Sequence, residues 1–326
     1  MQVKIRIGGD EIALAENETV LEALERHGVP MLSSCRSGIC QSCMLKAEEG
    51  AIPPQAQQGL KESLRAQKYF MSCVCKPTQD MTVAQPGAAL DFQTQVLASR
   101  DAGAGVRLLR LQVPPAFDWF AGQYITIVRE GRIARSYSIA SGPTDEYIEL
   151  HVRRIPGGII SNWLHDIVKP GDPISFRGPF GDCFYTPADP DAPLLLAGTG
   201  TGLAPLYGIV RDALRQGHRG AIAVLHGALD ESGIYHREEL SALARKGQIE
   251  YAPCVLNGDG CIFPPLLVGS LDDVVAARPI DLKTTKAYLC GDPAIVGKMR
   301  KKLFMRGLSN KRIFADPFVS AAVVRK

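Results

Sequence analysis

The sequence lacks long apolar runs, a strong excess of charge of either sign, internal repeats and low-complexity segments. No stretch approaches the roughly 20 apolar residues that a transmembrane helix requires. The net charge is only +3 over 326 residues. This balance gives no reason to expect nucleic acid or a membrane as a partner.

The composition is that of an ordinary globular protein, with 46% hydrophobic and 22% charged residues. At roughly 100–200 residues per domain, the length predicts two or three domains. Residues 1–7 alternate apolar and polar side chains. This alternation is typical of a strand rather than of a secretory signal. We therefore expect a cytoplasmic location.

Nine cysteines are distributed unevenly along the chain. In a cytoplasmic chain of this size they are expected to be metal ligands or free thiols rather than disulfides. Four are scattered singly, namely Cys183, Cys254, Cys261 and Cys290. The other five crowd into the first quarter, namely Cys35, Cys40, Cys43, Cys73 and Cys75.

Three stretches of the chain differ in pattern and predict three domains. Residues 1–88 combine a hairpin, a helix near 20–27, the cysteine-rich loop and a late strand. Residues 89–188 contain short apolar runs between turn signals, which predicts a small antiparallel β-barrel. Residues 189–326 alternate apolar strands with helical stretches, which is the pattern of an α/β domain with a parallel sheet.

Individual elements can be placed by the same patterns. The barrel strands are expected at 93–99, 106–113, 124–129, 135–139, 147–153 and 173–177, with one helix at 160–167. The parallel strands are expected at 194–197, 221–226, 250–254, 286–290 and 312–315.

The cysteine-rich loop has the spacing C-x4-C-x2-C at Cys35, Cys40 and Cys43, with a fourth cysteine 29 intervening residues later at Cys73. This is the plant-type [2Fe–2S] spacing, in which four thiolates hold two irons. A zinc site would more often use two C-x2-C pairs, and buried structural thiols are the other alternative. From the residues alone, both Cys73 and Cys75 are candidates for the fourth ligand.

The tetrapeptide Arg135-Ser136-Tyr137-Ser138 lies on an expected barrel strand. Arg135 could pair with a phosphate, and Tyr137 could lie against a flavin ring. The alternative is a barrel with an exposed arginine and a core tyrosine. The residues that follow favour an FAD site, because Gly157 and Gly158 open a helix whose N–H groups can bind an anion. The other candidates beside them are His151, Val152, Arg153 and Ser161.

A glycine-rich turn follows the apolar strand at 194–197 and precedes a helix. It reads Gly198-Thr199-Gly200-Thr201-Gly202 and is followed by Pro205. Glycines at such a turn let a pyrophosphate approach a helix N-terminus, which predicts a nicotinamide-nucleotide site.

Two acidic residues, Asp230 and Glu231, stand at the end of the next strand. An acid here accepts hydrogen bonds from ribose hydroxyls and repels a 2′-phosphate. No arginine or lysine lies between His226 and Glu231. The sequence therefore favours NADH over NADPH.

Together these motifs resemble the ferredoxin–NADP reductase superfamily. More narrowly, domain order and length resemble the reductases of Rieske aromatic-ring dioxygenases, of the naphthalene dioxygenase reductase type. The resemblance covers nearly the whole chain. It rests on the cysteine loop, Arg135–Ser138, Pro156–Ser161, Gly178–Gly181, Gly198–Pro205, Cys290–Pro293 and Asp316–Phe318.

The resemblance implies a β-grasp fold for the first domain and several residue roles. The segment Tyr69–Cys73 is similar to the strand that delivers the last cluster ligand, which selects Cys73 and leaves Cys75 a neighbouring thiol. By the same resemblance, Ser138 approaches flavin N5, and Cys290 lies near the nicotinamide, together with Gly291 and Asp292. Phe318 is the matching aromatic that covers the flavin.

Two residues depart from the family pattern. Gln41 replaces a glycine often found between the second and third cysteines, and Leu229 stands where many relatives have an arginine. The second departure bears on the choice of nucleotide.

The implied activity is that of a monomeric reductase that passes electrons from NADH through FAD to a [2Fe–2S] cluster and on to a ferredoxin or oxygenase component. A flavin must lie between the other two groups, because NADH gives two electrons at once and the cluster accepts one at a time. A reductase of a di-iron monooxygenase or of a deoxysugar dehydrase is an alternative on the same scaffold. A redox sensor without turnover is a third hypothesis, and it leaves the nicotinamide site without a purpose.

Overall fold

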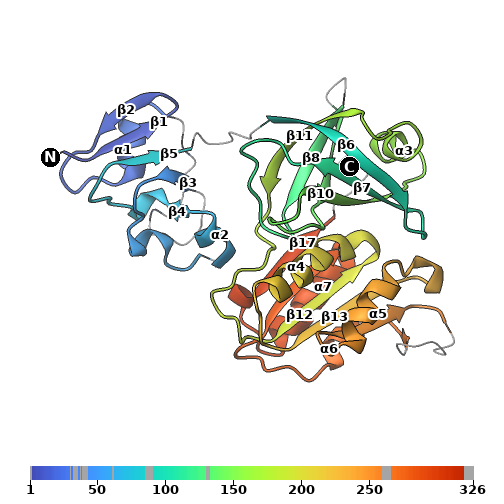
Figure 1. Ribbon diagram of the computed structural model, residues 1–326. Helices are drawn as coiled ribbons and strands as arrows, with labels where there is room; N and C mark the ends of the chain where they lie inside the picture. The colour runs from blue at the N-terminus through green and yellow to red at the C-terminus, as the bar shows by residue number, and fades with distance from the viewer. Residues whose placement is uncertain are drawn as a thin grey trace. The chain divides into compact units, whose positions relative to one another are not determined.

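The computed structural model describes two compact units, Met1–Ala89 and Leu90–Lys326, and each is considered by itself (Figure 1). The residues described are 2–29, 31, 36, 38, 43–60, 62–84, 91–129, 133–258 and 266–318.

A five-stranded sheet forms the first unit, in the order β2-β1-β5-β3-β4. β1 and β2 form an antiparallel hairpin, and β1 also pairs in parallel with β5. Apolar side chains alternate along β1, so Ile5 and Ile7 enter the core while Arg6 faces solvent. The strands are β1 (Lys4–Ile7), β2 (Asp10–Ala13), β3 (Met44–Glu49), β4 (Tyr69–Met71) and β5 (Met81–Val83).

Helix α1 (Val20–Arg26) packs its apolar side chains into the core of this unit. A capping box fixes its start: the Thr19 Oγ1 accepts from the Glu22 N–H, and the Glu22 carboxylate accepts from the Thr19 N–H at 2.8 Å. The remaining short helices are η1 (Pro54–Gln57), α2 (Glu62–Ala66) and η2 (Ser72–Val74).

The second unit begins with an antiparallel six-stranded sheet in the order β10-β7-β6-β11-β8-β9. A β-bridge between Ile139 and Leu150 joins the two ends of this order, which closes the sheet into a barrel. Helix α3 (Ile159–Asp166) packs Ile160 and Leu164 into the barrel core. The strands are β6 (Asp91–Asp101), β7 (Val106–Gln112), β8 (Tyr124–Arg129), β9 (Ile133–Ser138), β10 (Tyr147–Arg153) and β11 (Pro173–Phe180).

A parallel sheet of six strands completes this unit, in the order β15-β14-β13-β12-β16-β17. Its strands are β12 (Leu194–Thr199), β13 (Ile222–Ala228), β14 (Glu250–Val255), β15 (Leu267–Val268), β16 (Lys286–Gly291) and β17 (Ile313–Pro317). Two apolar clusters cover its two faces. One includes α4 (Leu203–Arg215) and α5 (Arg237–Arg245), and the other includes α6 (Leu271–Ala277) and α7 (Pro293–Met305).

The barrel and the parallel sheet share an apolar cluster. Val106 and Leu108 of β7 belong to the same cluster as Leu203 and Leu206 of α4. This shared packing holds the two domains together as one unit.

The predicted architecture of three domains is confirmed. The sequence patterns missed β3 and the two-residue edge strand β15, whereas β4 lies in the Tyr69–Cys73 segment that the family resemblance gives as a strand. β3 begins directly after Cys43, and the cysteines and small residues before it show no alternation of apolar side chains. β15 is too short to show a pattern.

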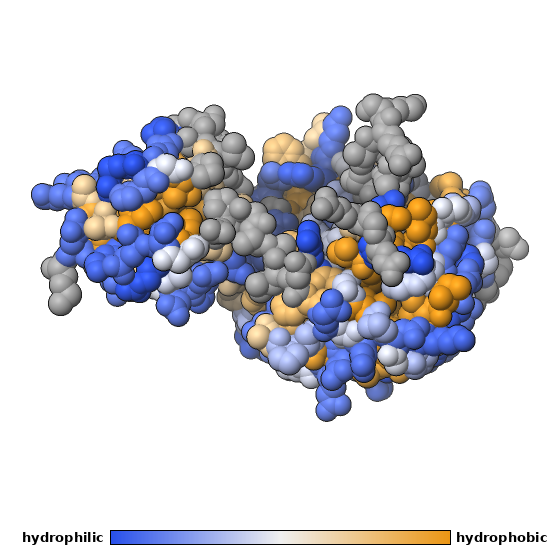
Figure 2. Space-filling model, turned by 90° about the horizontal axis from the view of Figure 1, so that it is seen from above, coloured by the Kyte–Doolittle hydropathy of each residue, from blue (hydrophilic) through white to orange (hydrophobic). Residues whose placement is uncertain are grey.

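The surface mixes polar and apolar side chains, and Figure 2 shows hydrophilic groups over much of one face with apolar patches between them. Large exposed apolar side chains include Ile167, Leu229 and Met305. Within the described ranges, no helix has the length and apolar character needed to cross a membrane.

Candidate functional site

Two of the predicted cluster ligands, Cys43 and Cys73, lie in one small apolar cluster with Leu21, Leu60 and Met71. The Ser72 side chain donates a hydrogen bond to the Cys43 carbonyl at 2.7 Å, and the Ser72 N–H donates to the same oxygen at 3.2 Å. The segment after β4 is therefore tied directly to the cysteine loop. Cys35 and Cys40 lie outside the described residues.

Cys75 belongs to a different environment from Cys73. It is fully buried in the main core of the sheet, which also contains Ile5, Leu24 and Phe70. Burial raises the pKa of the Cys75 thiol to about 12, which disfavours the thiolate that an iron ligand requires. The pair Cys43 and Cys73 therefore fits an iron–sulfur cluster, whereas Cys75 fits a structural thiol.

The predicted flavin tetrapeptide occupies the end of β9. Arg135 and Ser136 are exposed, and Tyr137 is partly buried, which raises the pKa of its hydroxyl. The Ser136 hydroxyl lies 3.0 Å from the Thr126 hydroxyl on β8. An exposed guanidinium beside an aromatic ring suits a phosphate-bearing flavin.

Ser138, the last residue of β9, is buried and contacts the parallel sheet. Its hydroxyl donates a hydrogen bond to Oδ2 of Asp316 on β17 at 3.1 Å. Burial raises the pKa of Asp316 to about 6, although the bond from Ser138 acts in the opposite direction. The sequence patterns alone assign no role to Asp316, the first residue of the terminal Asp-Pro-Phe motif.

Gly157 and Gly158 precede helix α3, as the sequence predicts. Gly157 has φ of +69°, which favours glycine, and a Cβ on Gly158 would collide with Ser161. Gly158 caps the helix without a side-chain bond, so the first N–H groups are suited to an anion. The Ser161 hydroxyl instead accepts from the Ile155 N–H at 3.2 Å and stabilises this turn.

His151, Val152 and Arg153 lie in sequence on β10 but point to different surroundings. Val152 is fully buried in the barrel core, so a ligand could contact only its backbone. The His151 ring is also buried, 3.0 Å from the Tyr235 hydroxyl. Arg153 is exposed, and a Cβ on Gly200 would lie 3.3 Å from its guanidinium. Of these three side chains, only that of Arg153 therefore lies beside the glycine-rich turn.

The glycine-rich turn runs from the end of β12 through η4 (Gly200–Gly202) into α4, and Pro205 is buried in the first turn of that helix. A Cβ on Gly202 would lie 2.5 Å from the Cys290 carbonyl, and a Cβ on Gly198 would lie 2.7 Å from the Gly202 carbonyl. The His226 Nε2–H donates to the Gly200 carbonyl at 3.1 Å. These contacts require glycine and fit a loop that a pyrophosphate approaches closely.

Thr199 joins this turn to the predicted nicotinamide segment. Its hydroxyl accepts a hydrogen bond from the Asp292 N–H at 2.8 Å. The Asp292 carboxylate accepts from two N–H groups at the start of α7, so it acts as the N-cap of this helix. The Phe318 N–H donates to the Gly291 carbonyl at 2.8 Å, which places the terminal motif beside the same segment.

Cys290 lies on β16, where it pairs in register with Asp316 of β17. Its sulfur is 3.7 Å from that of Cys183, and burial raises the pKa of its thiol. Ser138, Asp316 and Cys290 are therefore brought together where the barrel meets the C-terminal ends of the parallel strands. Ligands of open α/β sheets typically bind at this edge.

The acidic pair follows β13, where Asp230 is the N-cap of the short helix η5 (Glu231–Gly233) and Glu231 is its first residue. The Asp230 carboxylate accepts from the Ser232 N–H at 2.9 Å and remains exposed. Arg237, at the start of α5, lies 4.0 Å from the Glu231 carboxylate. The fold thus brings Arg237, a cation from outside the segment 226–231, to the acidic pair. The sequence did not predict this contact.

Three family models match successive parts of the chain. They are a 2Fe-2S iron-sulfur cluster binding domain over residues 5–78, an oxidoreductase FAD-binding domain over 93–185 and an oxidoreductase NAD-binding domain over 196–301. These matches confirm the three predicted cofactor classes.

Two curated relatives and one solved structure extend over almost the whole chain. The aromatic O-demethylase reductase subunit of Amycolatopsis is 31% identical over 99% of this chain and 100% of the relative. The ferredoxin–NAD(P)+ reductase component of the naphthalene 1,2-dioxygenase system of Pseudomonas putida is 29% identical, with the same coverage. The crystal structure of an Amycolatopsis cytochrome P450 reductase has a TM-score of 0.66 and 29% identity, covering 98% of this chain and 99% of that chain.

The chain therefore belongs to the family of oxidoreductases that join a [2Fe–2S] domain to FAD-binding and NAD-binding domains. It is an electron-transfer reductase, as the sequence predicts.

Proposed function

We propose that this protein takes electrons from NADH and delivers them one at a time, through FAD and the [2Fe–2S] cluster, to a ferredoxin or oxygenase component of an aromatic-ring dioxygenase system. The observation that carries the proposal is the contact between Ser138 and Asp316 beside Cys290. It joins the predicted flavin strand of the barrel to the predicted nicotinamide edge of the parallel sheet.

Bound FAD supplies the chemistry of accepting a hydride and releasing single electrons. The protein holds and orients its cofactors. Arg135 and the N-terminus of α3 are suited to the FAD phosphates, and the Tyr137 ring is suited to the flavin face. At the flavin edge, the Ser138 hydroxyl can donate a hydrogen bond, and the Asp316 carboxyl can accept or release a proton. Arg153 adds a positive charge beside Gly200.

The nicotinamide nucleotide is assigned to the Gly198–Gly202 turn with Pro205, to the Cys290–Asp292 segment and to the ribose acceptor Asp230. Phe318 is proposed to cover the flavin until the nicotinamide arrives. The cluster is assigned to four thiolates, two of which, Cys43 and Cys73, lie in the described residues. The remaining residues proposed around FAD are Ser136, Gly157, Gly158 and Ser161, together with His151 and Val152 through their backbone groups.

We place the domain boundaries near residues 88 and 188, which the matched ranges 5–78, 93–185 and 196–301 support. We expect a monomer in the cytoplasm, because a chain with all three cofactor sites needs no second copy to transfer electrons. Its macromolecular partner is then the acceptor protein.

The relatives favour one further acceptor. One of them is the reductase subunit of an aromatic O-demethylase, and the solved structure is a cytochrome P450 reductase. A monooxygenase or demethylase is therefore the second candidate for the acceptor. The FAD and cluster chemistry is the same in both cases.

Anaerobic mixing of the holoprotein with NADH tests the order of electron transfer. We expect the flavin absorption to bleach first and the EPR signal of the reduced cluster to follow. A purified Rieske dioxygenase and a cytochrome P450 are then offered as acceptors. Faster NADH turnover with the dioxygenase supports the proposal, whereas faster turnover with the P450 assigns the protein to the second class.

A further inference from the structure

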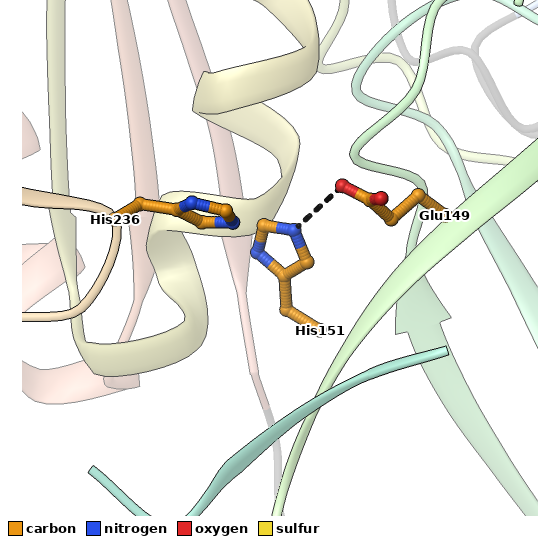
Figure 3. A group of neighbouring side chains, drawn as sticks. All are labelled: Glu149, His151 and His236. Carbon is orange, nitrogen blue, oxygen red and sulfur yellow. Dashed lines mark hydrogen bonds and ion pairs between the residues drawn. The ribbon is translucent and has the colours of Figure 1, made fainter. Parts of the chain in front are cut away.

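A buried group of one carboxylate and two imidazoles lies where the barrel meets the parallel sheet (Figure 3). Glu149 and His151 come from β10, and His236 precedes α5. Their relative exposures are 2%, 3% and 8%. One ligand atom from each residue lies within 4.8 Å of those of the other two. Neither hydride transfer nor cluster binding accounts for this group.

The separation between Glu149 and His151 is long for a charged hydrogen bond. Oε1 of Glu149 lies 3.4 Å from Nε2 of His151, whereas an N–H bond to a carboxylate is usually about 2.7–2.9 Å. A tetrahedral zinc ion with bonds of about 2.0–2.1 Å places neighbouring ligand atoms about 3.4 Å apart. The two side chains are therefore spaced as ligands of a common ion.

His236 supplies an unpartnered ligand atom in this buried position. Its Nε2 has no hydrogen-bond partner and is shielded from solvent, and Figure 3 shows it directed toward the His151 ring. Its ring is stacked on Tyr207, with ring centroids 4.6 Å apart and planes 8° from parallel. Because the ligand atoms lie within 4.8 Å of one another, side-chain shifts of up to about 1.4 Å bring the group to the ligand separation of about 3.4 Å in a zinc site.

The outer contacts orient all three side chains as metal sites require. Nδ1 of His151 lies 3.0 Å from the Tyr235 hydroxyl, which can accept a hydrogen bond from an Nδ1–H when Nε2 binds a metal. Nδ1 of His236 lies 3.3 Å from the Glu239 carboxylate, which is the carboxylate–histidine arrangement found behind zinc ligands. The second oxygen of Glu149 accepts from Arg110 at 2.7 Å.

We propose that Glu149, His151 and His236 form a site for one Zn²⁺ ion that links the barrel to the parallel sheet. Two imidazoles and one carboxylate favour zinc over magnesium or calcium, which prefer oxygen ligands. Because the ligands come from both domains, the ion stabilises the arrangement in which Ser138 meets Asp316.

Zinc binding to the holoprotein tests this proposal. The protein, with FAD and its cluster in place, is dialysed against EDTA and then equilibrated with zinc sulfate, and zinc and iron are counted per chain. We expect one zinc per chain with no loss of iron. X-ray absorption at the zinc edge should show nitrogen or oxygen neighbours at about 2.0 Å and no sulfur at about 2.3 Å.

Variants identify the ligands. His236→Asn tolerates the left-handed backbone (φ +54°) and removes the Nε2 ligand, so the zinc affinity should fall by about 100-fold or more. Glu149→Gln should lower the zinc affinity by a similar factor, and it replaces His236→Asn as the test variant if His236→Asn does not fold. His218→Asn is the control, because His218 also contacts a tyrosine hydroxyl, that of Tyr185, at 3.2 Å, and its zinc affinity should match that of the wild type.

Three results overturn the proposal. They are the absence of stoichiometric zinc, sulfur neighbours around the zinc, which place it on cysteines, and an unchanged affinity in both ligand variants.

Discussion

The Ser138 hydroxyl donates a hydrogen bond of 3.1 Å to the Asp316 carboxylate, from the end of β9 to β17. The pKa of this carboxyl is raised to about 6 because burial disfavours its charge. A group that changes protonation near pH 6 therefore lies at the junction of the proposed flavin and nicotinamide sites.

The first prediction concerns the pH dependence of flavin reduction by NADH. The rate should show an inflection near pH 6, which Asp316→Asn removes. Ser138→Ala should move the inflection to higher pH, because the lost hydrogen bond favours the ionised carboxylate. Stopped-flow absorption between about pH 5 and 8 measures both effects. An inflection that survives in Asp316→Asn would assign it to another group.

The second prediction applies the same shift to stability. The pKa of Asp316 rises from 3.8 to about 6 on folding, so its ionisation disfavours the folded state, and this cost grows as the pH rises through that interval. Asp316→Asn should stabilise the protein at pH 7 by on the order of 2–3 kcal/mol and have little effect near pH 4. The temperature of FAD release on heating measures the difference. Equal shifts at both pH values would contradict the assignment.

The third prediction concerns the cluster ligands. Cys73→Ser should lose the brown colour and the EPR signal that appears on reduction, because one of four thiolates is gone. Cys75→Ala should keep both, since Cys75 lies in the core of the sheet. Cys254→Ala, in the parallel-sheet domain, controls for the loss of a buried thiol. If Cys75→Ala loses the cluster and Cys73→Ser keeps it, Cys75 is the fourth ligand and Cys73 is the structural thiol.

The fourth prediction separates hydride transfer from electron exit. A truncated protein of residues 90–326, which forms a compact unit, should bind FAD and be bleached by NADH. Its cytochrome c reduction should collapse, because the cluster domain is absent. If the truncated protein binds FAD but NADH does not reduce it, the proposed order of transfer is wrong.

The fifth prediction concerns nucleotide choice. The wild type should have the higher kcat/KM for NADH, by about ten- to a hundredfold (~1.4–2.8 kcal/mol), because a 2′-phosphate meets Asp230 and Glu231. Asp230→Ser should reduce the preference. Arg237→Ala should increase it, because the cation 4.0 Å from Glu231 is removed. Equal kcat/KM values for both nucleotides in the wild type would contradict this account.

The sequence was sufficient to predict the three domains and their cofactor classes, because each depends on local features. The cysteine spacing, the alternation along the barrel strands and the strand–glycine–helix pattern all lie within short segments. The assignment of Cys73 over Cys75 instead needed a family resemblance. On a strand, Cys73 and Cys75 would point to the same face, because they are two residues apart. The short helix η2 (Ser72–Val74) directs them into different surroundings instead, and the sequence pattern does not reveal that helix.

Contacts between distant segments could not be predicted in this way. Asp316 is 178 residues from Ser138, and Arg237 reaches Glu231 only because α5 begins beside η5. His151 was expected at the cofactor, yet its ring lies in a buried contact with Tyr235. The alternation along this strand predicts that the His151 ring points away from the barrel core. It does not predict that the ring contacts Tyr235 of the parallel-sheet domain.

The Thr199–Asp292 hydrogen bond and the close packing of Gly202 on Cys290 connect two loops at the centre of the sheet. Asp230 follows the neighbouring strand β13 as the exposed N-cap of helix η5, apart from these contacts. Substitutions at Asp230 can therefore change the selectivity for the proposed ribose end of the dinucleotide while the contacts at its proposed nicotinamide end stay intact. A different cellular electron source then requires only surface substitutions, and the packing around Cys290 is unaffected.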